Sequence, residues 1–108
     1  MKIVLITFEQ FTDVDVYLPW NLLNRVKRPD WTVRILADSP RVTSRTGLGL
    51  EVHGPLSEAR EADAVIITSG DLTRTLSKDA AFLAKLELAP SRQLIGSMCS
   101  GALILGAK

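Results

Sequence analysis

Four short, almost continuous apolar runs constrain the fold of this chain more than any other feature of its 108 residues. They are KIVLITF (2–8), WTVRILA (31–37), AVIIT (64–68) and LIGSM (94–98). Runs of this length, rich in β-branched residues, are typical of strands buried on both faces of a sheet. Because helical or turn-rich segments separate them, the sequence predicts an α/β three-layer sandwich whose sheet is mostly parallel and wound right-handedly.

The segments between these runs have their own signals. Helical spacing extends over 13–28, and we expect the helix to begin near Asp15 because Pro19 is tolerated only in the first turns. Ser77 is expected to cap a second helix that ends near Leu88. Three smaller elements are also predicted: a hairpin around Gly47 and Gly49, one helical turn over 56–61 and a buried helix over 100–107.

Charge and cysteine content narrow the functional classes. Thirteen basic and twelve acidic residues give a net charge of +1, which provides no electrostatic basis for binding nucleic acid or an anionic membrane. The longest uncharged stretch, 94–107, is too short to span a bilayer. The single cysteine can form neither an intramolecular disulfide nor a zinc cage, so we expect a cytoplasmic protein without a metal or cofactor.

The segment GSMCSG (96–101) carries the chemistry that the sequence predicts. It lies between a predicted strand and a predicted helix, and small residues flank Cys99, as in the sharp turn of a nucleophile elbow. A helix amino terminus favours the thiolate, and the N–H of the following Ser100 can stabilise an oxyanion. The pattern is S-x-C-x-G, whereas an elbow with the usual glycine would read G-x-C-x-G. The alternative is a small buried cysteine packed as an apolar residue.

Two other loops follow predicted strands and therefore belong to the same edge of the sheet. Asp13 and Asp15 follow the first strand, where a carboxylate could accept a proton or hold a water near Cys99, or could simply cap the helix. The segment 69–71 (SGD) follows the third strand, where it could offer a second oxyanion N–H or form an ordinary turn. His53, the only histidine, lies in the hairpin region away from these loops, and we do not expect it to be catalytic.

With these elements in order, the chain resembles the ThiJ/PfpI superfamily over essentially all 108 residues. That superfamily has the class I glutamine amidotransferase-like fold, with a flavodoxin-like sheet. The resemblance is closest to the branch of isonitrile hydratases and of sensor-like domains in some AraC-type regulators. Four segments are similar to the family's acid loop, hairpin, oxyanion turn and cysteine elbow: ITFEQFTDVDVYLPWNLL (6–23), SRTGLGLEV (44–52), TSGDLTR (68–74) and GSMCSGALILGA (96–107).

The resemblance implies a role for each candidate residue. Cys99 would be the nucleophile, and Asp15, which matches the acid of the family's D-x-x-G-P element, would move protons or position water. Ser100 would be the hydroxyl residue after the cysteine, where threonine is common, and it would contribute to catalysis and to the oxyanion site. Gly70 would be the glycine of the oxyanion turn. The ligand would be a small-molecule substrate with an electrophilic carbon, or an oxidant.

The chain also departs from the family pattern. Leu18 and Asn21 stand where glycine and glutamate are usual, and 69–72 (SGDL) replaces a glycine pair followed by Pro-Gly. The family domain continues past the elbow helix, so 1–108 is expected to be a single partial domain, truncated after that helix. It would be a fragment, a chain with a tight partner or a natural half-domain. Because a half-sheet leaves an apolar edge, we expect a homodimer or pairing with the missing half-domain.

Three functions remain open at this point. The first is a cysteine-dependent hydratase or hydrolase of a small molecule, with isonitrile hydration as the nearest example. The second is a non-catalytic, thiol-based stress or redox sensor, because an exposed reactive thiol is oxidised selectively. The third is the ligand-sensing domain of a regulator. No helix-turn-helix pattern or basic stripe is present, so this chain alone is not expected to bind DNA.

Overall fold

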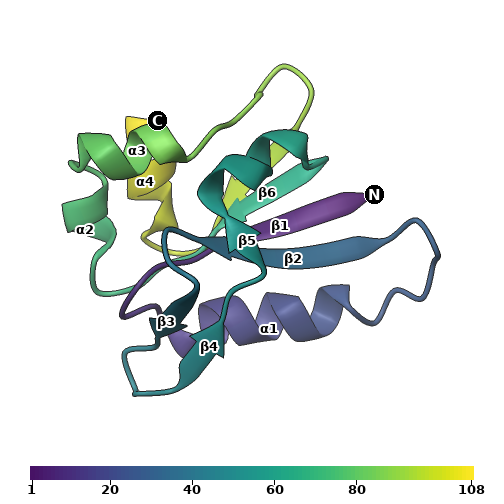
Figure 1. Cartoon of the computed structure of the whole chain (residues 1–108), viewed down its shortest axis with the longest axis horizontal. Helices are drawn as coiled ribbons and strands as arrows, with labels where there is room; N and C mark the ends of the chain where they lie inside the picture. The colour runs from purple at the N-terminus through teal and green to yellow at the C-terminus, as the bar shows by residue number, and fades with distance from the viewer.

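A computed structural model describes all residues from 1 to 108, and Figure 1 shows the arrangement of its helices and strands. The strands are β1 (Lys2–Ile6), β2 (Thr32–Ala37), β3 (Arg41–Thr43), β4 (Gly49–Glu51), β5 (Gly54–Pro55), β6 (Ala64–Ile67) and β7 (Leu94–Ser97). The helices are α1 (Asp13–Leu23), α2 (Thr73–Leu76), α3 (Ala80–Lys85) and α4 (Gly101–Ala107), with a 3-10 helix, η1 (Leu56–Glu61). Each of the four predicted strands is present, with ends that lie within two residues of the predicted ones.

The main sheet has five strands in the order β5-β2-β1-β6-β7, and every neighbouring pair is parallel. Strand β1 lies at the centre, where Val4 is in register with Arg34 of β2 and with Val65 of β6. Strands β3 and β4 form a separate antiparallel hairpin. The order of the strands reverses between β1 and β6, which is the point where open α/β sheets place their binding sites. The predicted parallel α/β fold is confirmed.

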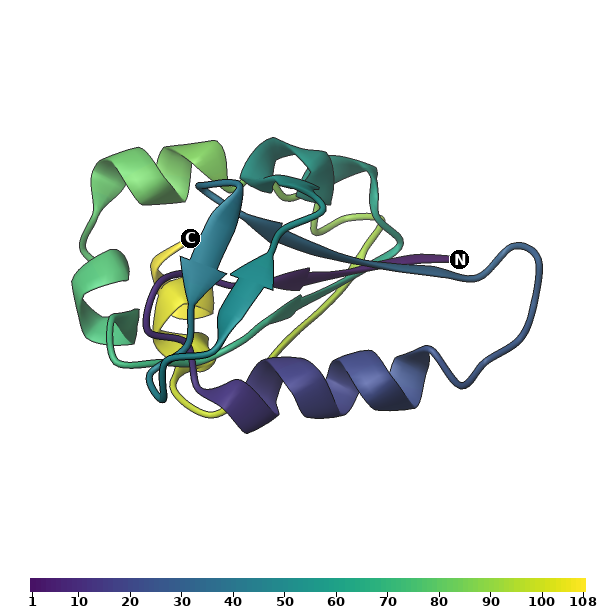
Figure 2. The ribbon, with the colours of Figure 1, turned by 60° about the horizontal axis from the view of Figure 1, so that its bottom comes forward.

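Apolar side chains cover both faces of the sheet, which is the middle of three layers. Figure 2 shows α1 on one side of the sheet and η1 with α3 on the other. On the η1 side, the core contains Val4, Ile6, Leu56, Val65, Ile67, Phe82 and Ile104, from β1, η1, β6, α3 and α4. On the α1 side, the core contains Leu5, Phe11, Val16, Val33, Ile35 and Val42. Because alternate strand residues enter opposite cores, the central strands are apolar throughout.

Helix α1 is shorter than the helical spacing predicted. It ends at Leu23, whereas the predicted end was Arg28. Asn24 Nδ2 donates to Trp20 O at 2.8 Å, and Trp31 Nε1 donates to Leu23 O at 2.9 Å. The carbonyl of Trp20 also accepts the helical hydrogen bond from the N–H of Asn24, at 3.2 Å. The carbonyl of Leu23 would accept from the N–H four residues later in a longer helix, and the Trp31 indole takes that place, so the helix ends there.

The helix predicted from Ser77 to Leu88 is present but shorter: it is α3, which spans Ala80–Lys85, and the separate short helix α2 precedes it. The predicted cap, Ser77, is wrong. Ser77 follows α2, and its N–H donates to Thr73 O at 3.0 Å. The residue that caps α3 is Asp79, whose Oδ1 accepts from the N–H of Phe82 at 3.1 Å. Aspartate is as good an N-cap as serine, and in this segment Asp79, two residues after Ser77, begins the helix.

Helix α4 was predicted to be buried, and only part of it is. Gly101 and Ile104 are buried, but Leu103 is 44% exposed. A Cβ added to Gly106 would meet nothing within 4 Å. The helix contacts α2, β6 and β7 with one side, and its other side faces solvent. Small apolar residues therefore predicted the helix but not the extent of its burial.

Candidate active site

The three loops predicted to share one edge of the sheet are in contact there. Phe11, in the loop after β1, forms an isolated bridge with Gly70, in the loop after β6. Thr73 Oγ1, at the start of α2, lies 2.8 Å from Oγ of Ser100, in the loop after β7. These contacts bring the candidate residues to the carboxyl ends of the strands, next to the reversal of strand order between β1 and β6.

Cys99 lies in the turn between β7 and α4 with a φ angle of 43°, a conformation that residues other than glycine rarely adopt. Gly101 permits this tight turn, because a Cβ there would lie 2.4 Å from Ile67 O and 2.7 Å from Thr68 O. Cys99 is exposed, so the alternative of a cysteine packed in the core is wrong. The turn has the strained geometry of a nucleophile elbow.

The backbone around Cys99 offers free hydrogen-bond donors. The N–H groups of Cys99 and Ser100 have no acceptor in the chain. The next two N–H groups are occupied: Gly101 donates to Met98 O at 2.8 Å, and Ala102 donates to Cys99 O at 3.4 Å. A free N–H directly after a nucleophile is the donor that an oxyanion site requires. The oxyanion role of Ser100 stays a prediction.

Asp15 lies in the first turn of α1 and is only 6% exposed. Its carboxylate accepts a hydrogen bond at Oδ2 from Oγ of Ser69, the residue that follows Thr68 at the end of β6. The N-cap of α1 is Thr12, whose carbonyl accepts from the N–H of Asp15 at 3.0 Å, so Asp15 is not the helix cap. The hydrogen bond between Asp15 and Ser69 joins the loops that follow β1 and β6.

Asp13, the other candidate carboxylate, interacts with the hairpin instead. Its Oδ2 accepts from Thr46 Oγ1 at 2.6 Å. Hydrogen bonds from Thr46 and Ser44 hold the pKa of Asp13 below its ordinary value. Asp13 therefore anchors the β3–β4 hairpin to α1, and Asp15 is the acid that contacts the candidate site.

Gly70 is required by the close approach of two loops. A Cβ at this position would lie 2.5 Å from Gln10 O and 2.7 Å from Phe11 Cα. The carbonyl of Gly70 accepts from Thr73 Oγ1 at 2.8 Å, whereas its N–H has no acceptor in the chain. This free N–H is compatible with the predicted oxyanion role of Gly70, which stays a prediction.

Thr73 is a residue that sequence reasoning missed, and it joins the oxyanion turn to the elbow. It is 3% exposed, and its hydroxyl contacts Gly70 O and Ser100 Oγ, each at 2.8 Å. Because the single hydroxyl proton of Thr73 goes to the carbonyl of Gly70, Ser100 must be the donor in the other contact. The oxygen of Ser100 is then left with lone pairs, which makes it an acceptor toward any group bound at the elbow. The sequence feature that could have indicated this role is a hydroxyl residue three positions after Gly70.

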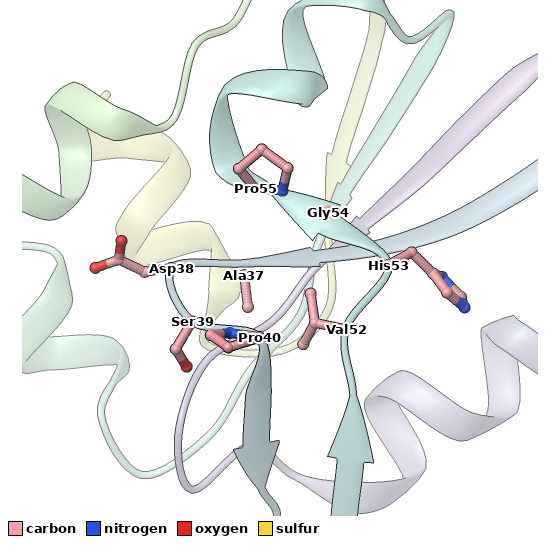
Figure 3. A pocket seen from close by; sticks show the side chains of 8 residues that line it. All are labelled: Ala37, Asp38, Ser39, Pro40, Val52, His53, Gly54 and Pro55. Carbon is pink, nitrogen blue, oxygen red and sulfur yellow. The ribbon is translucent and has the colours of Figure 1, made fainter.

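The pockets of the structure lie away from these residues. Figure 3 shows a pocket of about 340 Å³ that is lined by residues 37–40 and 52–55. The candidate residues Asp15, Gly70, Cys99 and Ser100 line none of the pockets. The elbow is thus an open surface rather than an enclosed cavity.

His53 has a structural environment beside the pocket of Figure 3. Its Nδ1 accepts from the N–H of Ile35 at 2.8 Å, and its ring lies 5.2 Å from the ring of Trp20. Partial burial, reinforced by the charge of Arg34, holds the pKa of His53 below its ordinary value, although Glu58 opposes the shift. The neutral ring therefore joins β2 to the segment before β5.

Two general features complete the description of the site. No group of three or more His, Cys, Asp or Glu side chains is arranged to hold a metal ion. Every helix falls short of the length and apolar character that a membrane-crossing segment needs.

Together, these features define an α/β protein with a cysteine at a strand–helix elbow and a buried acid at the adjacent switch point. The family model of the DJ-1/PfpI family matches residues 1–108, and the chain belongs to this family. The ThiJ/PfpI membership expected from the sequence is therefore confirmed. Among curated proteins, none matches the sequence significantly.

Solved structures share this fold. A ThiJ/PfpI family protein from Pseudomonas syringae superposes with a TM-score of 0.85 at 28% identity, over 98% of this chain and 45% of that chain. For Schizosaccharomyces pombe DJ-1 the TM-score is 0.75 at 18% identity, over 99% of this chain and 62% of that chain. A two-domain protein from Anabaena variabilis contains DJ-1/ThiJ/PfpI-like and ferritin-like domains. Its TM-score is 0.79 at 20% identity, over 98% of this chain and 31% of that chain. The chain thus spans less than two thirds of each of these proteins.

Proposed function

We propose that this chain carries the nucleophile and the acid of a small-molecule hydratase or hydrolase, of the kind found in the isonitrile-hydratase-like branch of the family. The observation that carries the proposal is the hydrogen-bonded connection across the three loops. Ser69 joins the acid Asp15 to the oxyanion turn, and Thr73 joins that turn to Ser100, next to the exposed Cys99. A nucleophile, a proton acceptor and free N–H donors are the groups that such a reaction needs.

In the proposed reaction, Cys99 Sγ attacks the terminal carbon of an isonitrile and forms a C–S bond. The thiol proton passes by way of Asp15 to the same carbon, which gives a thioimidate. Water then adds to this carbon, and the C–S bond breaks as the thiol is restored, so that R–NC and water yield R–NH–CHO. The free N–H groups of Gly70 and Ser100 would stabilise negative charge that develops during these steps.

A second candidate function is a thiol sensor. It is favoured by the exposure of Cys99 and by the absence of a pocket around the elbow, since oxidation needs an accessible thiol rather than an enclosed substrate. Cys99 would be oxidised by peroxide to a sulfenic or sulfinic acid.

Asp15→Asn distinguishes the two candidates. For a hydratase, this variant abolishes the turnover of cyclohexyl isonitrile, followed as formamide release, and leaves Cys99 oxidisable by peroxide, followed by intact mass. Cys99→Ser is the control that removes both signals. If the wild-type chain turns over neither isonitriles nor carbonyl electrophiles while its thiol is still oxidised, the sensor is favoured. Loss of both signals in Asp15→Asn, or of neither, contradicts the division of roles.

A further inference from the structure

The carboxylate of Asp15 is nearly enclosed, and its side-chain partner is a hydroxyl rather than a cation. Asp15 is 6% exposed, and Ser69, which donates to it, is 3% exposed. Buried charged groups are retained in proteins only where hydrogen bonds or opposite charges compensate for lost water. Removal of the Ser69 hydroxyl would leave the carboxylate without a side-chain donor.

Ser69 occupies only one of the two carboxylate oxygens. Its proton goes to Oδ2 of Asp15, and Oδ1 has no hydrogen-bond partner. The only side-chain oxygen or nitrogen that is both fully buried and unpartnered is Thr7 Oγ1, so Oδ1 of Asp15 keeps some contact with solvent. The serine therefore fixes the carboxylate while it leaves one oxygen free to accept a proton.

The same backbone segment holds both partners of this hydrogen bond. The N–H of Thr12 donates to Ser69 O at 2.8 Å, and the carbonyl of Thr12 accepts from the N–H of Asp15 at 3.0 Å. The two side chains therefore project from backbone positions that are fixed relative to each other. A hydrogen bond between groups held in this way restricts the side-chain rotation of Asp15.

We propose that Ser69 is a positioning residue, which holds Asp15 so that Oδ1 can transfer protons at the Cys99 elbow. This inference rests on the function proposed above, and it goes beyond it because it assigns a role to Ser69, whose hydroxyl is the side-chain donor to Asp15. Ser69 itself does not contact the reacting atoms; it acts through Asp15.

The test is a double-mutant cycle with Ser69→Ala and Asp15→Asn. Two readouts are measured on each variant: the hydration of cyclohexyl isonitrile, and the rate at which iodoacetamide alkylates Cys99 between pH 5 and 9. We expect Ser69→Ala to lower kcat about tenfold with KM nearly unchanged, because an oriented hydrogen bond to a charged group is lost. Because Asp15→Asn abolishes turnover, the cycle is completed with the alkylation readout: in combination with Asp15→Asn, Ser69→Ala should have no further effect on the pH profile of alkylation.

Two further variants separate positioning from a structural role. Ser69→Thr keeps the hydroxyl and should restore kcat to within about threefold of the wild type. Ser77→Ala removes an exposed hydroxyl that donates to Arg74 O, and it should leave kcat unchanged. If Ser69→Ala changes the pH profile of alkylation equally with and without Asp15→Asn, or if Ser69→Thr fails to restore kcat, the positioning role is overturned.

The failure of this proposal differs from the failure of the proposed function. If Asp15→Asn changes neither turnover nor the alkylation profile, Asp15 has no role at Cys99, and both proposals are overturned. If Asp15→Asn changes either readout and Ser69→Ala changes neither, only the assignment of Ser69 is overturned. The alkylation readout gives this answer even for a chain without measurable turnover.

Discussion

Strands β1 and β7 belong to the same sheet, but their surroundings differ, and the burial expected of both from the sequence is wrong for β7. Val4, Leu5 and Ile6 of β1 are 0% exposed, whereas Leu94 at the start of β7 is 70% exposed. Strand β1 has a neighbour on each side, whereas β7 pairs only with β6, and a Cβ on Gly96 would meet nothing within 4 Å. The position of a strand in the sheet, rather than its apolar character, therefore decides how far it is buried.

The candidate site has residues in both environments, the buried centre of the sheet and its exposed edge. Asp15 and Ser69 lie on the enclosed side, where both are more than nine-tenths buried. Cys99 lies at the end of β7 and is exposed. A fixed acid and an accessible thiol suit chemistry in which the reactant arrives from solvent and the proton is moved by a group held in place.

The largest expected effect on stability comes from shortening a buried side chain on β6, and it is compared with shortening an exposed side chain on the adjacent strand β7. Ile67→Ala on β6 should lower the free energy of unfolding by about 2–5 kcal/mol, because it leaves a cavity in the core. Leu94→Ala on β7 should change it by no more than about 0.5 kcal/mol, since that side chain is exposed. Urea denaturation at low protein concentration measures both. Losses of equal size would show that β7 is as enclosed as β6.

The two glycines of α4 sharpen the comparison within one helix. Gly101→Ala should cost about 1–3 kcal/mol, because its Cβ would collide with the carbonyl oxygens of Ile67 and Thr68. Gly106→Ala, which meets no atom within 4 Å, should instead add about 0.5 kcal/mol through its higher helix propensity. Thermal unfolding followed by circular dichroism measures the pair. If Gly101→Ala is tolerated, the tight junction between α4 and β6 is disproved.

Much of this fold could be predicted from the sequence, because the central strands leave a direct physical signature. A strand with a core on each face is expected to be apolar along its length, and residues 3–6 (IVLI) and 64–67 (AVII) are. The end of α1 at Leu23 could not be predicted in the same way. It depends on a hydrogen bond from Trp31, which is distant in the sequence and reaches the helix only after the chain has turned back.

The candidate site likewise has features that the sequence could predict and features that it could not. Small residues around Cys99 predicted a sharp turn, because only small side chains permit a strand and a helix to approach so closely. The burial of Asp15, its hydrogen bond from Ser69 and the contact between Thr73 and Ser100 could not be predicted. Loops far apart in the sequence create these contacts, and a serine or threonine in a turn has the same local pattern whether or not it contacts a distant residue.

The open edge at β7 leads to a proposal about assembly. The N–H groups of Leu94 and Met98 donate to Asp63 O and Ile67 O of the β6 side, at 3.0 and 2.8 Å. By alternation, the backbone groups of residues 95 and 97 face away from β6, where no strand pairs with them. Neither proline nor lysine protects this edge between 94 and 97. We propose that two copies pair through β7.

The assembly proposal is tested with a charge at the edge. Leu94→Lys should weaken self-association at least about tenfold, because it places a charge beside the pairing strands. Leu48→Lys is the matched control, since Leu48 is also exposed, at 55%, but lies in the loop of the hairpin. Sedimentation velocity over a range of concentrations measures both. A wild-type chain that stays monomeric, or equal weakening by the two variants, counts against pairing through β7.

The smallest expected effect concerns pH and belongs to the edge of the sheet formed by β2 and β5. Because the pKa of His53 is below its ordinary value in the folded protein, the folded state disfavours the protonated ring. Its contribution to stability is therefore complete above the unfolded value of about 6.5 and is lost as the pH falls through the lower folded value. Protonation at Nδ1 also removes the acceptor for the N–H of Ile35.

Urea midpoints at pH 7.5 and pH 5 test this expectation in the wild type and in His53→Gln. Glutamine keeps an acceptor for the Ile35 amide but does not titrate, so the wild type should lose more stability between the two pH values than the variant. Glu58, whose pKa is lowered mainly by its hydrogen bond from Arg34, stays ionised over this range and should not contribute. Equal losses in the two proteins would remove His53 as the acid-sensitive group. Amide exchange should place the acid effect at Ile35 of β2 and leave β7 unchanged, because His53 accepts from the N–H of Ile35 and lies beside β5, at the opposite edge of the sheet from β7.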